Sequence, residues 1–532
     1  MWNCLNVRAA LAGILAMTMI SGTAASQPPT TARQLWAEYV KNPNAHPNIP
    51  NCSYAGYRYG ESGLPTARVV VSVRDLGAKA DGQTDDAAAF ARAIDAAAKA
   101  GGGAVLVPAG TYALDGMIRL TANGVVLRGE GPEKTILHFR RSLSDVLGPL
   151  RNRDGSSQYS WCGGLIWIGP ADTFAADGRL DGGLRESWRG GARLAAVSAA
   201  AKRGDFVVRV DNPAALKAGD RVLMTWDNPE DLSLMHWMAG HPLMEKYDWR
   251  GAGAGLVGTR RWLWPVQIQS VSEAEVRLRQ PLRVDVRPEW KVGFEALGPV
   301  ISEAGVESLG MRFDNRRPYK HLTDEGFNGI YLNRAWNCFV RDVAIRDAQN
   351  GVIHAAAKNT TVVGLRLAGR DHHHATALRV ASHDNLITDF VIESRPHHGI
   401  NTEALSTGNV WRNGDMKNGT FDSHRAMSFE LIRTNITINN NGRPGGANTA
   451  GPFLGARCVH WNVRITNGNA EWVYQPDAIS SGALVGIQGS EPSNKAAWAM
   501  VEGDKGCIVA DHGRVPEPAD LYEAQLRLRL GR

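Results

Sequence analysis

The sequence predicts an all-β fold of stacked coils, a solenoid, and two repeats point to it. Histidine sites recur at His373, His397 and His424. Asparagines begin short strand-like runs with a similar rhythm, at Asn337, Asn359, Asn385, Asn409, Asn435 and Asn462. Both repeats have steps of about 20–30 residues, a period that is typical of solenoids in a strand-rich region. We expect the asparagine amides to form one internal ladder of hydrogen bonds.

The composition of the 532 residues agrees with a solenoid that is rich in turns. The chain is 43% hydrophobic and 21% charged, which supports a packed core and excludes global disorder. A net charge of +6 fits an anionic partner such as an acidic polysaccharide, and it fits equally well a slightly basic surface without a specific partner. We see no nucleic-acid-binding module and no lysine- or arginine-rich run.

The N-terminus, residues 1–25, has the pattern of a secretory signal peptide. Arg8 supplies a positive charge, residues 9–20 are apolar but too short to span a bilayer, and Thr23-Ala24-Ala25 forms a small-residue cleavage site. No later segment has 18 consecutive apolar residues. We therefore expect a secreted or periplasmic protein with no membrane segment after cleavage. Its cysteines are too widely spaced for a metal cluster but leave room for one disulfide: Cys52, Cys162, Cys338, Cys458 and Cys507.

The N-terminal third begins with a polar leader, residues 26–66, whose aromatic segment 53–60 should lie against the body of the protein. Next, Val69–Val73 is a predicted strand, and Thr84 can cap a helix over residues 87–100 that ends at three glycines. Residues 104–107 form the following strand. Turn formation and helix capping explain the acidic cluster Asp81, Asp85 and Asp86 without a calcium ion.

Three stretches of this region, DLGAKADGQTDD, GGGAVLVPAGTY and VVLRGEG, resemble the N-terminal cap and first coil of the pectate-lyase-like superfamily. The resemblance implies a right-handed parallel β-helix with an N-terminal capping helix, and carbohydrate as the class of substrate. It places the cap and the first coils at residues 67–140.

Residues 141–297 interrupt the coil rhythm and are expected to form an insertion. Within it, residues 190–297 alternate apolar and polar side chains between turns, which predicts a small antiparallel β domain. Trp237 and Trp249 lie in a tryptophan-rich loop that either stacks on sugar rings or forms a separate hydrophobic cluster. The coils resume over residues 298–490, and residues 491–532 are expected to form an irregular C-terminal cap.

The histidines define the candidate site. His372, His398 and His424 follow Asn359, Asn385 and Asn409 by 13, 13 and 15 residues, which predicts equivalent corners of three coils. Six residues beyond His373, His397 and His424 lies a second column: Arg379, Glu403 and Glu430. Arg395, Asp422 and Arg425 border the corner. The catalytic candidates are His373, His398, Glu403, Asp422, His424 and Arg425. The substrate-binding candidates are Arg379, Arg395, His397, Glu430, Trp237 and Trp249.

This set of residues fits a polysaccharide lyase that cleaves a uronate-containing glycan by β-elimination. The reaction needs a base beside a uronate carboxylate, a cation that neutralises this carboxylate and an acid for the leaving oxygen. We predict His424 or His398 as the base, Arg425 or Arg395 as the cation, and the remaining histidine as the acid.

Several alternatives stay open. The histidines can be a structural ladder, or a zinc site, although their spacing matches no standard zinc motif. We therefore predict no metal and no cofactor; a divalent cation such as calcium is compatible but not indicated, because the arginine and calcium-aspartate patterns of classical pectate lyases are not recognisable.

Other reactions and oligomeric states also stay open. A glycoside hydrolase would use two of Glu403, Asp415, Asp422 and Glu430. Asp422-Ser-His424-Arg resembles the Asp-Pro-His-Asp motif of mannuronan C5-epimerases, with Ser and Arg in place of Pro and the last Asp. A glycan-binding β-helix without catalysis is the third alternative to the lyase.

Overall fold

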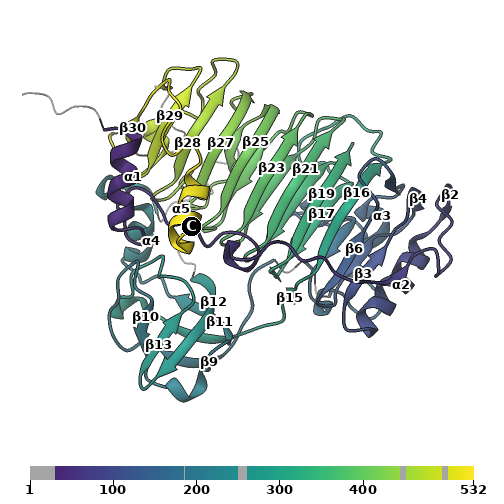
Figure 1. The fold of residues 1–532 in the computed structure, drawn as a ribbon, viewed down its shortest axis with the longest axis horizontal. Coiled ribbons are helices and arrows are strands. Elements are labelled where there is room, and N and C mark those ends of the chain that lie inside the picture. Colours follow the sequence, from purple (N-terminus) through teal and green to yellow (C-terminus); the bar gives the residue numbers. More distant parts are fainter. Residues whose placement is uncertain are drawn as a thin grey trace, which may run out of the picture.

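The protein is a parallel β-helix whose coils stack along the long axis of the molecule (Figure 1). The structure, a computed structural model, describes residues 30–532 except 182, 185, 250–260, 444–450, 494–500 and 502. The predicted signal peptide therefore lies outside the described residues. No helix among the described residues is long and apolar enough to cross a membrane.

A fifteen-stranded sheet forms the longest face of the solenoid, and its path runs parallel from the N-terminal cap to the C-terminus. Its strands along that path are β1 (Val69–Ser72), β3 (Gly103–Leu106), β6 (Val125–Arg128), β16 (Gly305–Phe313), β19 (Phe339–Arg346), β21 (Thr361–Ala368), β23 (Leu386–Ile392), β25 (Val410–Gly419), β27 (Ile432–Asn440), β28 (Val459–Ile465), β29 (Ala483–Gln488) and β30 (Ile508–Ala510). Off this path lie β2 (Asp81–Asp85), β4 (Gly110–Leu114) and β7 (Thr135–Phe139).

A seven-stranded parallel sheet forms the second face, and it carries the histidines. Its strands are β5 (Ile118–Leu120), β8 (Ile166–Ile168), β17 (Asn328–Asn333), β20 (Asn350–Ala355), β22 (His374–Arg379), β24 (Ile400–Thr402) and β26 (Phe421–Ser423). The third side is short: β15 (Ile301–Ser302) pairs with β18 (Ala335–Trp336), and single parallel bridges continue the stack.

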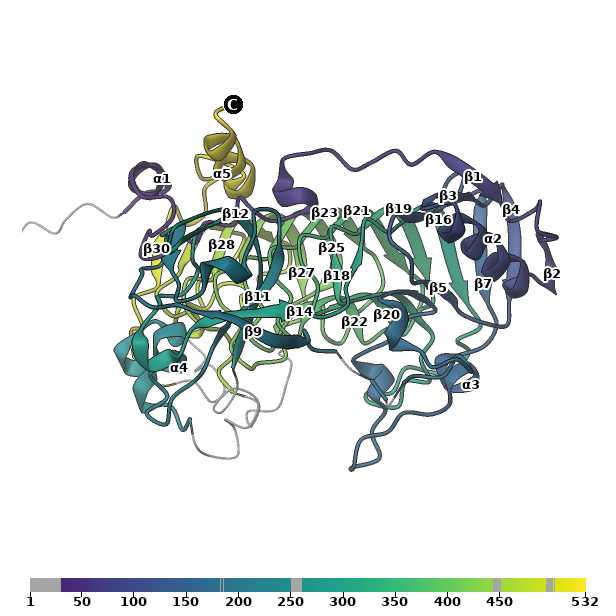
Figure 2. The ribbon, with the colours of Figure 1, turned by 90° about the horizontal axis from the view of Figure 1, so that it is seen from below.

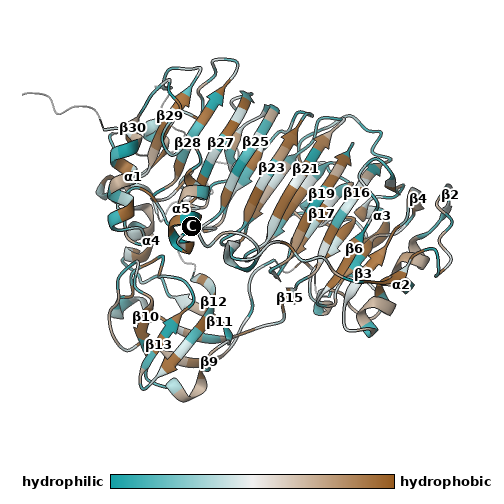
Figure 3. Cartoon of the chain, viewed as in Figure 1, coloured by the Kyte–Doolittle hydropathy of each residue, from teal (hydrophilic) through white to brown (hydrophobic). Residues whose placement is uncertain are grey.

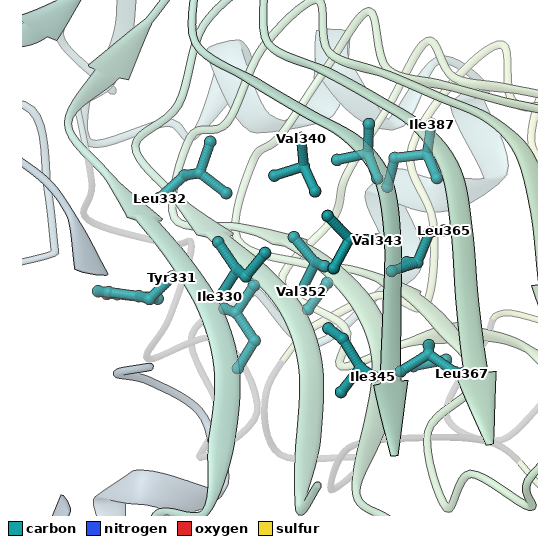
Figure 4. Packing of buried hydrophobic residues seen from close by; sticks show 14 of the residues in the cluster. Ile330, Tyr331, Leu332, Val340, Val343, Ile345, Val352, Leu365, Leu367 and Ile387 are labelled. Carbon is teal, nitrogen blue, oxygen red and sulfur yellow. The ribbon is translucent and has the colours of Figure 1, made fainter. Parts of the chain in front are cut away.

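Aliphatic side chains from successive coils fill the interior. Val340, Leu365 and Ile387 come from one sheet and Ile330 and Val352 from the other, and they pack against each other as Figure 4 shows. Hydrophobic stretches recur along the strands from β16 to β28 (Figure 3). Since each coil buries its apolar face only against its neighbours, stacking is what makes the solenoid stable.

Helix α2 (Ala87–Lys99) caps the N-terminal end as expected, but its cap differs from the predicted one. Asp86 occupies the N-cap position in place of Thr84, and its carboxylate accepts hydrogen bonds from the backbone N–H groups of Lys79 and Ala80. Asp81 accepts from Gln83 and Thr84. These two carboxylates therefore stabilise the turn before the helix through hydrogen bonds to backbone N–H groups.

Segments near the two ends of the described chain cover the outer side of the long sheet (Figure 2). Helix α1 (Ala32–Lys41) and the chain after it pack Leu35 and Ile49 against Ile432 and Trp461. Helix α5 (Leu521–Leu530) adds Leu521 to the same cluster. The C-terminal segment is thus more regular than predicted, since it holds both strand β30 and this helix.

A six-stranded antiparallel domain projects from the solenoid (Figure 1). Its strands are β9 (Gly190–Ala196), β10 (Val207–Arg209), β11 (Arg221–Trp226), β12 (Trp262–Ser272), β13 (Glu275–Leu278) and β14 (Gly293–Leu297), with helix α4 (Ser233–Ala239) beside them. The predicted insertion over 141–297 is too broad, because β8 belongs to the solenoid. Only helix α3 (Leu143–Leu147) and the flanking loops leave the coil before it.

The asparagine repeat occupies three structural positions rather than one ladder. Asn385 and Asn409 form a buried ladder, in which Asn385 Nδ2 donates to Asn409 Oδ1 over 3.0 Å. Asn435 and Asn462 lie in an exposed ladder that Asn413 joins. Asn337 and Asn359 lie one residue before the buried ladder position in the same turn, with φ values of 54° and 50°. The prediction of a single ladder was wrong because similar spacing does not imply the same position in the coil.

The cysteines form no disulfide in the part of the chain that the structure describes. Cys52, Cys162, Cys338 and Cys458 are buried free thiols, and Cys507 is a partly buried one. The disulfide that the sequence allowed is therefore absent among the described residues.

Candidate functional site

Strands β22, β24 and β26 bring the predicted histidines together at one end of the seven-stranded sheet. The His398 backbone N–H donates to the His373 carbonyl over 2.7 Å, which sets one coil directly over the other. The rings of His374 and His398 stack with centroids 4.9 Å apart. His374 Nδ1 lies 2.9 Å from Asn350 Oδ1, so an asparagine continues the column into the next coil.

His424 lies in a different column from the one predicted. The register pairs Thr376 with Ile400 and Ile400 with Phe421, so the second of these coils is shorter along the chain than the first. The shorter coil sets His424 opposite Glu403, and Glu403 lies opposite Arg379. The prediction of three histidines at equivalent corners was wrong for His424, because it assumed coils of nearly equal length.

Arg379, Glu403 and His424 form a connected row on the outer side of this sheet. Arg379 Nε donates to Glu403 Oε1 over 2.5 Å, and Glu403 Oε2 lies 3.4 Å from His424 Nδ1. Arg379 Nη1 also donates to Glu186 Oε1 over 2.5 Å and to the Trp161 carbonyl over 3.0 Å. Glu403 is buried, whereas the His424 side chain is 22% exposed. The buried charges of Arg379 and Glu403 therefore hold the partly exposed imidazole of His424 in place.

A second group lies beside this row, and two of its histidines, His373 and His398, are buried. His398 Nδ1 lies 2.9 Å from Asp422 Oδ2, and His398 Nε2 lies 3.3 Å from Nε2 of the exposed His321. His373 Nδ1 contacts the Ser160 carbonyl. The ring of His397 stacks on His321 with centroids 4.1 Å apart.

Trp161 covers both groups. Its ring centroid lies 4.3 Å from that of His424 and 4.9 Å from that of His373. The indole also approaches His374 and His398, at 5.6 and 5.9 Å. A partly exposed aromatic face beside a reactive imidazole is a surface on which a sugar ring can stack.

Burial and neighbouring charges set the protonation of the site. Burial, followed by the charge of His397, lowers the pKa of His398 well below its usual range, so this ring is neutral at pH 7. Burial alone would raise the pKa of Glu403, but Arg379 and His424 hold it below its usual range. Burial raises the pKa of Asp324 to about 6, against a hydrogen bond from Ser160 that lowers it.

The row opens into a cavity of about 500 Å³. Its walls include Gln158, Trp161, Glu186, Arg379, Glu403 and His424. A second cavity of about 420 Å³ shares Val380 and Ala404 with it and is lined by Trp188, Arg261 and Glu295. The two cavities are neighbours, and together they are called the groove below. Loop residues between 152 and 186 line the first, and residues of the antiparallel domain line the second.

Two predicted site residues lie away from the groove, and a third is buried beside it. Glu430 is buried among Arg203, Arg283 and Arg457, where it links the antiparallel domain to the solenoid. Arg395 is exposed on the side of His397 and does not line the groove. Arg425 follows His424 but is fully buried, and it interacts with Tyr247 and Asp422. None of these three side chains meets the groove surface.

The tryptophan loop also differs from the prediction of a sugar-binding surface. Trp249 is buried in the core of the antiparallel domain, and its Nε1 donates to the Met244 carbonyl. Trp237 is partly buried under Arg457 and lines a separate cavity with His236 and His241. The alternative of a separate hydrophobic cluster therefore describes this loop, because these rings fill the domain core.

Sequence reasoning missed Trp161, Glu186 and His321. Trp161 and Glu186 lie in the segment that was assigned to the insertion, and His321 lies in the loop of residues 314–327 between β16 and β17. None of them follows the coil period. Only the fold brings these three residues to the histidines. A single tryptophan outside any repeat, such as Trp161, does not indicate a functional site in the sequence.

Comparisons with known proteins agree with the N-terminal resemblance. Residues 70–163 match a family model described as rhamnogalacturonase A/epimerase, pectate lyase-like, and residues 396–532 match a domain of unknown function, DUF4955. Alginate lyase 7 from Azotobacter vinelandii is 38% identical over 98 residues, which are 17% of this chain and 11% of that protein. Mannuronan C5-epimerase AlgE4 from the same organism is 44% identical over 92 residues, which are 16% of each chain.

Among solved structures, the tailspike protein gp49 from Pseudomonas phage LKA1 covers 79% of this chain and 64% of its own, with 13% identity and a TM-score of 0.44. The AlgE6 A-module of an Azotobacter vinelandii mannuronan C-5 epimerase covers 84% of this chain and all of its own, with 13% identity and a TM-score of 0.35. The family model over the N-terminal cap and the coil topology described above lead to one conclusion. Residues 70–163 match the pectate-lyase-like family, and the parallel coils of the rest of the described chain support the pectate-lyase-like superfamily of β-helix proteins.

Proposed function

We propose that this protein is a carbohydrate-active enzyme that cleaves a uronate-containing polysaccharide by β-elimination. One observation carries the proposal: His424 opens into the groove beside Trp161 while a buried carboxylate, Glu403, holds its Nδ1 side. The other ring nitrogen, Nε2, is then available to exchange a proton with a bound sugar. A base oriented in this way is the central requirement of proton abstraction from carbon.

The reaction can be written with two groups that reach the substrate. Arg379 uses Nε and Nη1 for the glutamates, so its Nη2 can donate to the uronate carboxylate and stabilise the charge that develops there. His424 Nε2 removes the C5 proton, the C4–O bond breaks, and a C4=C5 double bond forms. The imidazolium then returns this proton to the leaving glycosidic oxygen. Glu403 is a positioning residue that orients both groups.

The carboxylates of the site argue against a glycoside hydrolase. Hydrolysis needs one carboxyl that is protonated at working pH and a second that is ionised, both facing the sugar. Glu186 and Glu403 both hold Arg379, the pKa of Glu403 is lowered, and Asp422 is fully buried. Asp415 pairs with Lys417, outside the groove lining. An imidazole is therefore the better candidate for proton transfer.

A uronate C5-epimerase is the second candidate. It starts with the same proton abstraction and ends with return of the proton to the opposite face of C5. The match to mannuronan C5-epimerases at about 40% identity over short segments supports it, as does the match to an alginate lyase. Both relatives carry names of enzymes that act on uronate polymers, which supports an acidic polysaccharide as the substrate. We also propose that the chain is exported, which would bring it to such a polymer.

A panel of acidic and neutral polysaccharides, alginate and pectate among them, tests the proposal. Elimination produces an unsaturated uronate that absorbs at about 230 nm, together with new reducing ends. Reducing ends without this absorbance would establish a hydrolase. No cleavage, but exchange of the C5 hydrogen in deuterated water, would establish an epimerase. Binding without any of these changes would leave only a glycan-binding protein.

A further inference from the structure

A cluster of three histidines lies at the side of the candidate active site, where residues 314–327 approach the coil of β24. One ring nitrogen from each of His321, His397 and His398 lies within 4.8 Å of the others. We propose that these three imidazoles bind a divalent transition-metal ion of the zinc class. The site stands apart from the proposed lyase reaction, which uses His424 and Arg379.

The separation of two nitrogens fits a shared metal ion. His321 Nε2 and His398 Nε2 face each other at 3.3 Å. Two ligands of a tetrahedral zinc ion, each at about 2.0–2.1 Å, are about 3.3–3.4 Å apart. A hydrogen bond between the two nitrogens would be long at this distance, since N–H donors approach acceptors at about 2.7–3.2 Å.

The buried side of the cluster is arranged as in histidine metal sites. His398 Nδ1 lies 2.9 Å from the buried Asp422 Oδ2. The negative charge of this carboxylate favours a proton on Nδ1 over one on Nε2, the nitrogen that faces His321. His373 adds a second buried imidazole with an unpaired Nε2, and its ring lies 5.0 Å from that of His321.

The donor atoms select the kind of ion. Imidazole nitrogens suit zinc, nickel, cobalt and copper, whereas calcium prefers six to eight oxygen ligands. Three histidines leave one position of a tetrahedron for water, on the side where His321 is exposed. The sequence showed no sign of this site because zinc motifs place their ligands close together, whereas His321 precedes His398 by 77 residues.

Two guanidinium groups oppose a cation here, and both are exposed. Arg443 Nη1 donates to His397 Nδ1 over 3.3 Å, and Arg395 lies nearby. A guanidinium only donates, so His397 must release Arg443 before it binds a metal through either nitrogen. The release costs little because water solvates the exposed Arg443 side chain.

Metal binding would tie residues 314–327 to the coil below. Tyr319, Lys320 and Asp324 from this segment line a cavity of about 670 Å³ next to the histidines. A clamp at His321 would therefore fix one wall of that cavity. Its effect on the folded chain is measurable without any substrate.

Zinc titration of the full chain, carrying no affinity tag of histidines and freed of metals with a chelator, tests the site. Calorimetry should give one zinc ion per chain, and zinc should raise the Tm. His321→Asn changes an exposed side chain and should keep the fold, yet it should weaken zinc binding at least about tenfold. His512→Asn, a partly exposed histidine far along the chain, is the matched control and should bind zinc as the wild type does.

Calcium should neither bind with this stoichiometry nor raise the Tm. The proposal is overturned if the wild type binds less than one zinc ion, if His321→Asn binds within tenfold of the wild type, or if His512→Asn weakens binding as much. None of these readouts uses catalysis, so loss of the lyase proposal would leave the metal site intact, and the reverse also holds.

Discussion

Arg379, Glu403 and His424 have different environments and therefore different roles at this site. Arg379 is held by two glutamates, Glu403 is buried between a cation and an imidazole, and His424 is the most exposed of the three. The sequence indicated all three as candidates from their spacing. It could not indicate their partners Glu186 and Trp161, which follow no repeat.

Replacing His424 with Asn tests the proposed base. Turnover should fall at least about 100-fold, because general-base catalysis contributes about 10²–10⁴ in rate. The fold should persist, since the side chain is partly exposed and its backbone N–H still donates to Asn401. Initial rates by ultraviolet absorbance and the Tm measure both effects. Turnover within tenfold of the wild type would mean that another group removes the proton.

Replacing Glu403 with Gln tests its positioning role. The amide keeps the shape but removes the charge that holds Arg379 and His424, so kcat should fall about 10–100-fold while KM changes much less. Glu403→Asp retains the charge and should recover part of the rate. Equal losses in both variants, or a loss confined to KM, would contradict a role through His424.

At the scale of elements, left-handed backbone positions explain the exposed asparagines. One register position of the long sheet has φ between 50° and 70° in every coil from β16 to β29. Gly, Asn and Asp tolerate this conformation best, and β-branched residues least. The residues are Ser308, Asp342, Gly364, Asp389, Asn413, Asn435, Asn462 and Gly486. The repeat of Asn413, Asn435 and Asn462 therefore has two causes, the left-handed backbone conformation and the hydrogen bonds between the side chains.

Two substitutions of Asn435 separate these causes. Asn435→Gly keeps the left-handed backbone and should change the free energy of unfolding by less than about 1 kcal/mol. Asn435→Val forces a β-branched residue into φ of 52° and should cost about 1–3 kcal/mol. Urea unfolding of both variants measures the difference. Similar losses would show that the ladder hydrogen bonds dominate.

At the scale of the whole molecule, a buried ion network joins the antiparallel domain to the solenoid. Arg283 of the domain contacts Asp384 and Glu430 of the solenoid, and Lys358 also pairs with Asp384. Phe429 and Leu405 of the solenoid complete the hydrophobic core of the domain. Both kinds of contact hold the two parts together and so position the domain wall of the second cavity.

This network should make stability depend on pH. Burial would raise the pKa values of Asp384 and Glu430, but Arg283 and Lys358 beside Asp384, and three arginines beside Glu430, hold both at about 2, against about 4 in the unfolded chain. Their stabilisation is thus complete above about pH 4 and is lost as the pH falls toward 2. Glu430→Gln should destabilise the protein by about 3–5 kcal/mol at pH 7 and should flatten this acid dependence.

Urea unfolding at pH 7, 5 and 3 checks the prediction for Glu430. The free energy of unfolding of the wild type should fall more steeply below pH 5 than that of the variant. Identical pH dependence would mean that these ion pairs contribute nothing to acid stability. An unchanged rate with polysaccharide at pH 7, in a variant that is still folded, is expected because Glu430 lies away from the groove.

The sequence by itself determined the stacked coils, the capping helix and the residue types of the site, because periodicity and turn chemistry act over short stretches of chain. The tertiary structure decided which side chains meet. The coil from β24 to β26 is shorter than the coil before it, which moved His424 into the row of Arg379 and Glu403. Loops outside the repeat brought Trp161, Glu186 and His321 to the histidines. Coil length and loop path depend on packing across the whole solenoid, and a local pattern does not encode them.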